Sequence, residues 1–177
     1  MASRKSWPKR EVKNPSVIAE RLLITSLLMA VAGCTGQDRG KEQSDSAFAA
    51  LQQRGETAMG VNQYTSQHVF ELLPGGGRIV LQRKESDSVG ETAIRAHMRQ
   101  IANAFASGDF ALPGFVHAMS DVPGTAVMKR LKGEITYTPR DLPRGAEVVI
   151  STRNPEGVSA IHEFLAFQRM DHRTGMH

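Results

Sequence analysis

The stretch GGRIVLQ at Gly76–Gln82 and the stretch GAEVVIS at Gly145–Ser151 share one pattern, a leading glycine followed by the β-branched and aliphatic residues typical of a strand. Each is followed by a similar helical segment, TAIRAHM at 92–98 and SAIHEFL at 159–165. We interpret the two halves as copies of one unit, a β-hairpin and a helix. Pairing of the units predicts an α+β fold with a mainly antiparallel four-stranded sheet and helices on one face, where each hairpin lies under its own helix.

Local signals predict where the elements begin and end. A turn is expected at Pro74–Gly77, a capping box runs from Ser88 to Glu91, and Asn154 precedes a proline that suits a first helical turn. Strands are expected at 64–73, 78–83, 134–138 and 147–152. Helices are expected at 47–59, 88–108, 125–132 and 155–172, with a Pro- and Gly-rich connector at 112–124.

The N-terminus has the three-part layout of a secretory signal. Residues 1–21 carry six basic and two acidic side chains, and residues 22–33 are apolar apart from Thr25 and Ser26. Those twelve apolar residues would reach roughly 18 Å as a helix, against a bilayer hydrocarbon core of about 30 Å. We therefore expect a cleaved export signal over 1–33.

The sequence VAGC at Val31–Cys34 resembles the lipobox of bacterial lipoproteins, in which the signal is cut just before a cysteine that is then acylated. On that resemblance Cys34 is the lipidation site, and two or three acyl chains would hold the domain firmly at a membrane. Thr35 stands where an aspartate would favour the inner membrane, so we expect the outer membrane with the domain facing the periplasm. The alternative is an ordinary cleaved signal with a chance cysteine.

The signal also accounts for the net charge of +4. It contains six basic and two acidic residues, which leaves 16 of each sign in residues 34–177. A neutral mature chain has no electrostatic footprint for nucleic acid, so no nucleic-acid partner is expected. The polar residues 34–46 are expected to form a flexible tether, and residues 47–177 a single α+β domain.

Histidine and methionine occur close together at several points along the chain. Imidazole and thioether groups suit copper, especially Cu(I), and haem is the second cofactor considered. The candidate ligands are His68, His97, His117, Met119, His162 and His172. The alternative is that the histidines are hydrogen-bonded structural residues and that the methionines fill the core, because no ligand motif of fixed spacing is present.

The stretch ISTRNPEG at Ile150–Gly157 resembles part of the carbamoyl-phosphate loop of transcarbamoylases, and it lies at a strand-to-helix junction where backbone amides can bind an anion. Asn154-Pro155 replaces the second Thr-Arg of that loop. The chain also lacks a His-Pro-x-Gln stretch, and the 144 residues after the signal are too few for that two-domain enzyme. We expect a strand end and a capped helix here, without transcarbamoylase activity.

Three longer stretches resemble one family of small exported bacterial proteins of unassigned function, some of whose members are named aspartate carbamoyltransferase. These stretches are RGETAMGVNQYTSQHVFELLPGGGRIVLQ at 54–82, MKRLKGEITYT at 128–138 and AIHEFLAFQRMDH at 160–172. The resemblance covers nearly all of residues 54–173 and implies one shared domain. It also implies matching histidines at His68, His97, His117, His162 and His172. Many relatives have a second histidine at the position of Gln67.

These observations predict a non-enzymatic, membrane-anchored binding or interaction domain with an unidentified protein or small-ligand partner. A metal-handling protein is the alternative, and a small transcarbamoylase-like enzyme ranks third. Convergence of His68 and His117 with either His97 or His162 would favour metal handling, whereas dispersed histidines would count against it.

Overall fold

The computed structural model describes residues 35–174. Residues from Thr35 onward form one compact unit, while the predicted signal and Cys34 lie outside the described residues. In the part of the chain that is described, no helix is long and apolar enough to cross a membrane.

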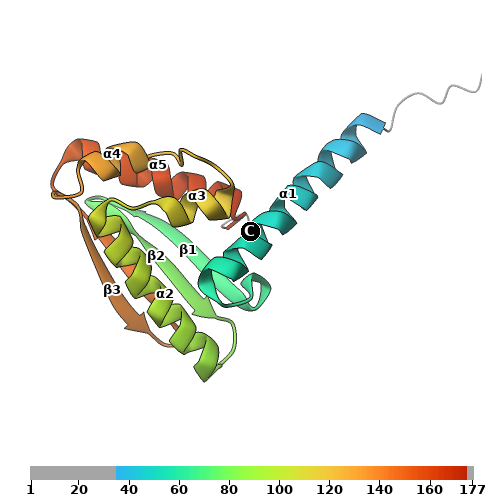
Figure 1. Ribbon diagram of the computed structural model, residues 1–177, viewed down its shortest axis with the longest axis horizontal. Helices are drawn as coiled ribbons and strands as arrows, with labels where there is room; N and C mark the ends of the chain where they lie inside the picture. Colours follow the sequence, from blue (N-terminus) through green and yellow to red (C-terminus); the bar gives the residue numbers. More distant parts are fainter. Residues whose placement is uncertain (1–34, 175–177) are drawn as a thin grey trace, which may run out of the picture. The chain divides into compact units, whose positions relative to one another are not determined.

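The sheet confirms the predicted fold class. Its four strands are β1 (Ser66–Leu73), β2 (Gly76–Arg83), β3 (Thr136–Leu142) and β4 (Gly145–Ser151). They lie in the order β1-β2-β4-β3, and every neighbouring pair is antiparallel (Figure 1). The two hairpins therefore meet through β2 and β4, the two glycine-led stretches of the repeat.

Glycine at the start of β2 lets the central strands approach closely. Gly76 has a φ of 143° and pairs with Ser151, and a Cβ atom at position 76 would lie 2.1 Å from the carbonyl oxygen of Ile150. A side chain cannot be accommodated there. The first hairpin consequently turns at Pro74-Gly75, and β2 begins two residues before the predicted Arg78.

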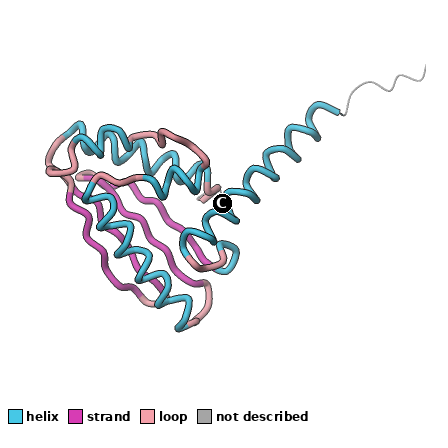
Figure 2. Tube along the Cα trace, viewed as in Figure 1, coloured by secondary structure: helices cyan, strands magenta, loops and turns pink. Residues whose placement is uncertain are grey.

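Helices α2 (Ser88–Ser107) and α5 (Pro155–Asp171) cover one face of the sheet (Figure 2). Asn154 caps α5 as predicted, accepting hydrogen bonds from the N–H groups of Glu156 and Gly157. The cap of α2 is Asp87, one residue before the predicted Ser88, because the Asp87 carboxylate accepts the N–H of Gly90.

The prediction that each hairpin lies under its own helix was wrong. Helix α2 packs mainly on β3 and β4, and α5 packs on β1 and β2. Arg95 of α2 donates to the carbonyl oxygens of Leu142 and Gly145, while Arg169 of α5 donates to that of Phe70. Each unit thus contributes its helix to the other, so neither unit could bury its own hairpin alone.

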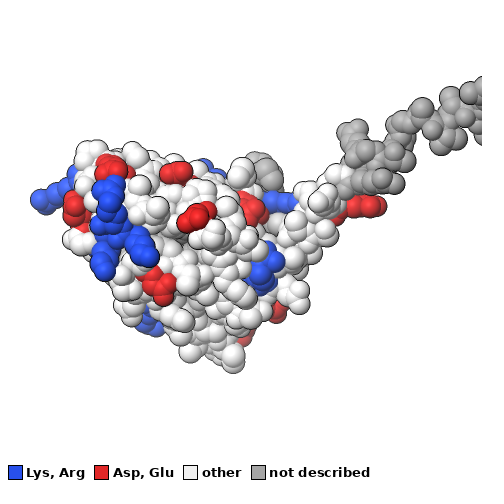
Figure 3. Space-filling view, turned by 45° about the horizontal axis from the view of Figure 1, so that its top comes forward, with Lys and Arg blue, Asp and Glu red and all other residues white. Residues whose placement is uncertain are grey.

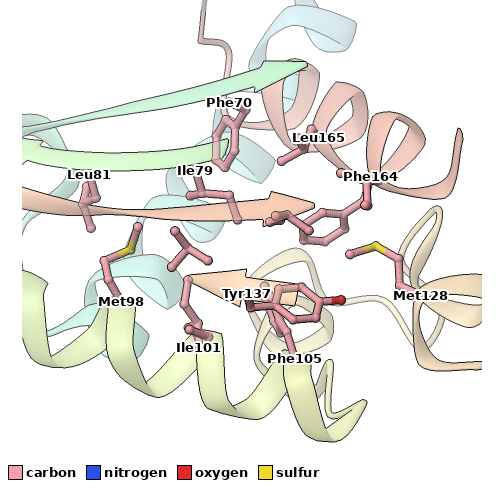
Figure 4. Close-up of a cluster of buried hydrophobic side chains, with 14 of the residues drawn as sticks. Phe70, Ile79, Leu81, Met98, Ile101, Phe105, Met128, Tyr137, Phe164 and Leu165 are labelled. Atoms are coloured by element: carbon pink, nitrogen blue, oxygen red, sulfur yellow. The ribbon is translucent and has the colours of Figure 1, made fainter. Parts of the chain in front are cut away.

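The core lies between the sheet and these two helices. Figure 4 shows Leu81 and Ile79 of the sheet in one cluster of buried side chains with Met98 of α2 and Phe164 of α5. Leu81 and Met98 are 0% and 1% exposed, and Phe164 is 1% exposed. Burial of such side chains contributes about 1.5–3 kcal/mol each, and one shared core therefore holds the exchanged units together.

The segment 35–46, predicted as a flexible tether, is helical. Helix α1 spans Thr35–Met59 and so begins twelve residues before the predicted Ala47. Side chains from 40 to 47 are exposed, whereas Leu51 and Met59 are buried. The polar segment contains no proline and includes two Gln with one each of Arg, Lys and Glu, so it can extend a helix whose later turns are packed.

Two short helices occupy the second half of the chain before β3. Helix α3 (Ala111–His117) lies inside the predicted connector, and α4 (Thr125–Arg130) agrees with the predicted short helix. Pro113 is compatible with α3 because it stands in the first turn, where an N–H would have no helical partner. Helix α3 ends at His117, so that imidazole is presented at a helix terminus.

The surface carries both signs of charge. Figure 3 shows Lys and Arg interspersed with Asp and Glu on the visible face, including one group of basic atoms that lies next to acidic ones. Several of these charges are paired, as in Arg99 with Asp141 and Arg130 with Glu156.

Candidate functional site

Four of the predicted histidines line one small cavity of about 70 Å³. His68 comes from β1, His97 from α2, His117 from the end of α3, and His172 from the residue after α5. The remaining walls are mainly aliphatic and aromatic, and they include Phe70, Ile79, Leu81, Met59, Met98 and Phe164. Elements that are distant in sequence thus bring four imidazoles to one largely apolar chamber.

His172 lies between two of the other rings. Its ring centre is 5.1 Å from that of His68 and 5.1 Å from that of His117, which it meets edge to face at 89°. The His68 ring is also stacked on Phe70, at 5.6 Å and an interplanar angle of 6°. These contacts place the His172 ring against the rings of both His68 and His117.

Burial keeps three of the imidazoles neutral. Burial lowers the pKa of His97 to about 4, and burial together with the nearby His97 lowers the pKa of His68 to about 4. The pKa of His172 falls to about 3, mainly through burial and then through His68 and His117, against a smaller upward effect of Asp171. At neutral pH these rings therefore keep a nitrogen lone pair that can bind a proton donor or a metal ion.

The fourth histidine is held by hydrogen bonds at both ring nitrogens. His117 Nδ1 lies 2.5 Å from Asp171 Oδ2, and its Nε2 lies 2.8 Å from Gln168 Oε1. Both partners belong to α5, on one face of which Gln168 and Asp171 follow each other at helical spacing. The His117 side chain is 1% exposed, so these two bonds determine its orientation.

Two ring nitrogens in the cavity are fully buried and have no hydrogen-bond partner among the described residues. Among the described residues, Nδ1 of His97 and Nδ1 of His172 are buried without a hydrogen bond. A buried polar atom left in this state costs about 1–3 kcal/mol, so it requires an explanation such as water or a bound ligand.

Two predicted ligands lie elsewhere. His162 Nε2 lies 2.8 Å from the carbonyl oxygen of Leu73, outside the cavity, and it ties α5 to the end of β1. Met119 is 39% exposed and lines a separate surface groove between α3 and α4. These two candidate ligands therefore lie apart from the four histidines that share the cavity.

The structure adds side chains that sequence reasoning missed. Met59 and Met98 line the cavity, and neither is among the six candidate ligands. Gln168 and Asp171 bind the two ring nitrogens of His117. The sequence contains a signal for this pair, because residues three apart on a helix share one face.

The cavity is not an assembled metal centre as it stands. Within residues 35–174, no group of three or more His, Cys, Asp or Glu side chains is arranged to hold an ion. Its volume is also small, because drug-sized ligands occupy about 300 Å³ or more. A single ion or a few small atoms fit the space, whereas a haem would require the walls to move apart.

Two surface grooves adjoin the cavity. His117 also lines a groove of about 320 Å³ together with Phe48 and Arg54 of α1. His68 and His172 line a second groove of about 410 Å³. Its other lining residues include Lys84 and the amide side chains of Gln52, Gln63 and Gln67. The imidazoles thus form the partition between the interior chamber and the protein surface.

The carbamoyl-phosphate-like loop is a capped helix start, as predicted. Strand β4 ends at Ser151, and Asn154 already occupies the first free N–H groups of α5. Asn154 also donates to the carboxylate of Glu134, 2.9 Å away. A carboxylate at this position is unfavourable for a phosphate, so the loop does not resemble an anion site in three dimensions.

Comparisons of this chain with known proteins found no matching family model, no matching curated protein and no similar solved structure. The family resemblance and the lipobox resemblance therefore stay predictions from the sequence.

Proposed function

We propose that this protein is a metal-binding domain held at the bacterial cell envelope, and that the histidine-lined cavity is its metal site. The observation that carries the proposal is the meeting of four imidazoles from four separate elements around one chamber. Imidazole nitrogen is the commonest protein ligand for transition metals, and only the neutral ring can bind them.

The partnerless nitrogens in the cavity support this proposal over a structural role. A structural buried histidine satisfies its polar atoms, as His117 does through Asp171 and Gln168. His97 and His172 each keep an Nδ1 without a partner among the described residues. A bound ligand would supply the partner that each of these nitrogens lacks, which supports a ligand site over a purely structural cluster.

The location at the envelope rests on the sequence. The signal layout and the VAGC stretch at Val31–Cys34 support export and lipidation of Cys34. Because α1 begins at Thr35, the lipidated residue would be followed directly by a helix, of which residues 40–47 are exposed. We infer that this helix holds the metal-binding domain away from the outer membrane, facing the periplasm.

The test is a metal titration of the full chain purified from membranes in detergent. Cu(I), Cu(II) and Zn(II) are added separately, and bound metal is measured by mass spectrometry after the free ion is removed. We expect one ion per chain, with binding lost in His97→Leu and kept in His162→Gln, which removes an imidazole outside the cavity. Equal binding by both variants would contradict the proposal.

A second candidate function is the binding of a protein partner, favoured by the groove between α3 and α4. This groove measures about 700 Å³, and Phe115 and Met119 in it are 49% and 39% exposed. Exposed apolar side chains of this size are typical of contact surfaces. A photo-crosslinking residue at Phe115 should then trap one defined protein in cells, while the same residue at exposed Glu85 should not.

A further inference from the structure

The hydrogen bonds in the cavity divide its histidines into two classes. His117 uses both of its ring nitrogens, on Asp171 and on Gln168. It could bind an ion only by giving up one of these bonds in a place where its side chain is 1% exposed. Losing a buried hydrogen bond costs about 1–3 kcal/mol, so His117 is a poor ligand in this arrangement.

The rings of His68, His97 and His172 have nitrogens that form no hydrogen bond among the described residues and can serve as ligands. Nδ1 of His97 and Nδ1 of His172 are buried without a partner among the described residues. Among the described residues, the histidine rings that form hydrogen bonds are those of His117 and His162. The ring of His68 stacks on Phe70 and contacts the His172 ring at a tilt. His172 lies against both His68 and His117, which places it at the centre of the group.

The charge of the cavity restricts the ion. The described residues that line it include no carboxylate, and Asp171, which bonds to His117 and has a small upward effect on the burial-lowered pKa of His172, lies outside this lining. The energetic cost of removing an ion from water rises with the square of its charge, so a divalent ion costs about four times as much as a monovalent ion of similar size. Neutral ligands in an apolar chamber therefore favour a singly charged ion.

The softer atoms around the chamber favour the same ion. The thioether side chains of Met59 and Met98 line the cavity, and they are 8% and 1% exposed. Thioether sulfur and neutral imidazole together select Cu(I) over hard cations such as Mg²⁺ and Ca²⁺.

We propose that His68, His97 and His172 bind a Cu(I) ion, and that His117 is a positioning residue whose ring supports His172. This rests on the proposed function of the cavity as a metal site. No three ligating side chains in residues 35–174 already surround one point, so binding requires a ring to turn. His172 is best placed to do so, because it follows the last residue of α5 and its Nδ1 has no hydrogen bond to break.

The experiment uses the full chain in detergent, without oxygen, with Cu(I) measured by competition against a chromophoric Cu(I) chelator. The variants are His68→Leu, His97→Leu, His172→Leu and His117→Gln, and His162→Gln is the matched control. Circular dichroism and thermal unfolding identify any variant that does not fold. X-ray absorption of the bound copper counts the nitrogen ligands, a readout that a merely structural role would leave unchanged.

We expect the three leucine variants to lose at least 100-fold in Cu(I) affinity and one nitrogen ligand each. His117→Gln should lose about tenfold, as substitutions that support a ligand do, and should keep three nitrogen ligands. Loss of a nitrogen ligand in His117→Gln, or tighter binding of Zn(II) than of Cu(I), would overturn this assignment while leaving a metal site in place. Failure of the wild-type chain to bind any of the ions would instead overturn the proposed function.

Discussion

The imidazole of His117 and the carboxylate of Asp171 lie 2.5 Å apart, although 54 residues separate them in the sequence. This bond joins the end of α3 to the end of α5 at the wall of the histidine cavity. With the second bond to Gln168, it fixes the ring against which His172 packs. The orientation of the His117 ring in the cavity wall therefore depends on a contact between two helix ends.

Removal of this carboxylate should destabilise the fold. In Asp171→Ala, the His117 N–H is left without its partner in a buried place, and we expect a loss of about 1–2 kcal/mol in the free energy of unfolding. Urea unfolding followed by circular dichroism measures it. Asp121→Ala is the control, because Asp121 is exposed and only the neighbouring Ser120 bonds to it. An equal effect of both substitutions would contradict the role given to Asp171.

Stability should fall as the pH is lowered from about 6.5 toward 5. The pKa of His97 is about 4 and that of His172 about 3 in the folded protein, below the ordinary value of 6.5. In this range the unfolded chain binds protons that the folded chain does not. Over this range the free energy of unfolding should thus fall by up to about 1.4 kcal/mol per pH unit for each of these histidines. Above pH 7 the two histidines should not change it, because they are neutral in both states.

Urea midpoints from pH 8 to pH 5 measure this slope. The double variant His97→Leu/His172→Leu should show a shallower dependence than the wild type, because the substituted side chains bind no proton in either state. A wild-type midpoint that stays constant down to pH 5 would show that these rings are not held neutral by burial.

Substitution of one loop glycine should disturb the contact between α4 and α5. Gly124 has a φ of 80°, and a Cβ atom there would lie 2.2 Å from the carbonyl oxygen of Ala160. Gly124→Ala should therefore lower the free energy of unfolding by about 2 kcal/mol or more. Gly133→Ala should change it by no more than about 1 kcal/mol, since nothing lies within 4 Å of that position. Thermal unfolding of the two variants compares them, and similar melting temperatures would argue against this backbone account.

The lipid anchor is tested at Cys34. In cells fed a labelled fatty acid, the wild-type chain should incorporate the label and sediment with membranes, because acyl chains hold it there. Cys34→Ser should remain unlabelled, and Thr35→Ser should behave as the wild type. Label retained in Cys34→Ser would show that the cysteine is not the acylated residue.

Four of the six candidate ligands expected from the sequence line the cavity, and the other two lie elsewhere. His68, His97, His117 and His172 were in the candidate set and do converge. Their meeting could not be derived from spacing, because each belongs to a different element and the distances depend on how those elements pack. His162 and Met119 were included for their residue types alone, and tertiary packing directs them to a strand end and to a surface groove.

Local sequence by itself determined most elements of this protein, although not α3 or the first part of α1. Continuous runs of β-branched and aliphatic residues after a glycine define β2 and β4, and Asn154 before Pro155 starts α5, because these preferences act over a few residues. The antiparallel four-stranded sheet followed from pairing two such units.

Only the tertiary structure decided that the units exchange helices and that the imidazoles share a chamber. Both depend on the burial of apolar surface between segments far apart in the chain, such as Leu165 of α5 against Gly77 of β2. Hydrophobic burial has no direction along the sequence, so a local pattern does not specify which hairpin a helix covers. The position of His172 between His68 and His117 is a consequence of that choice.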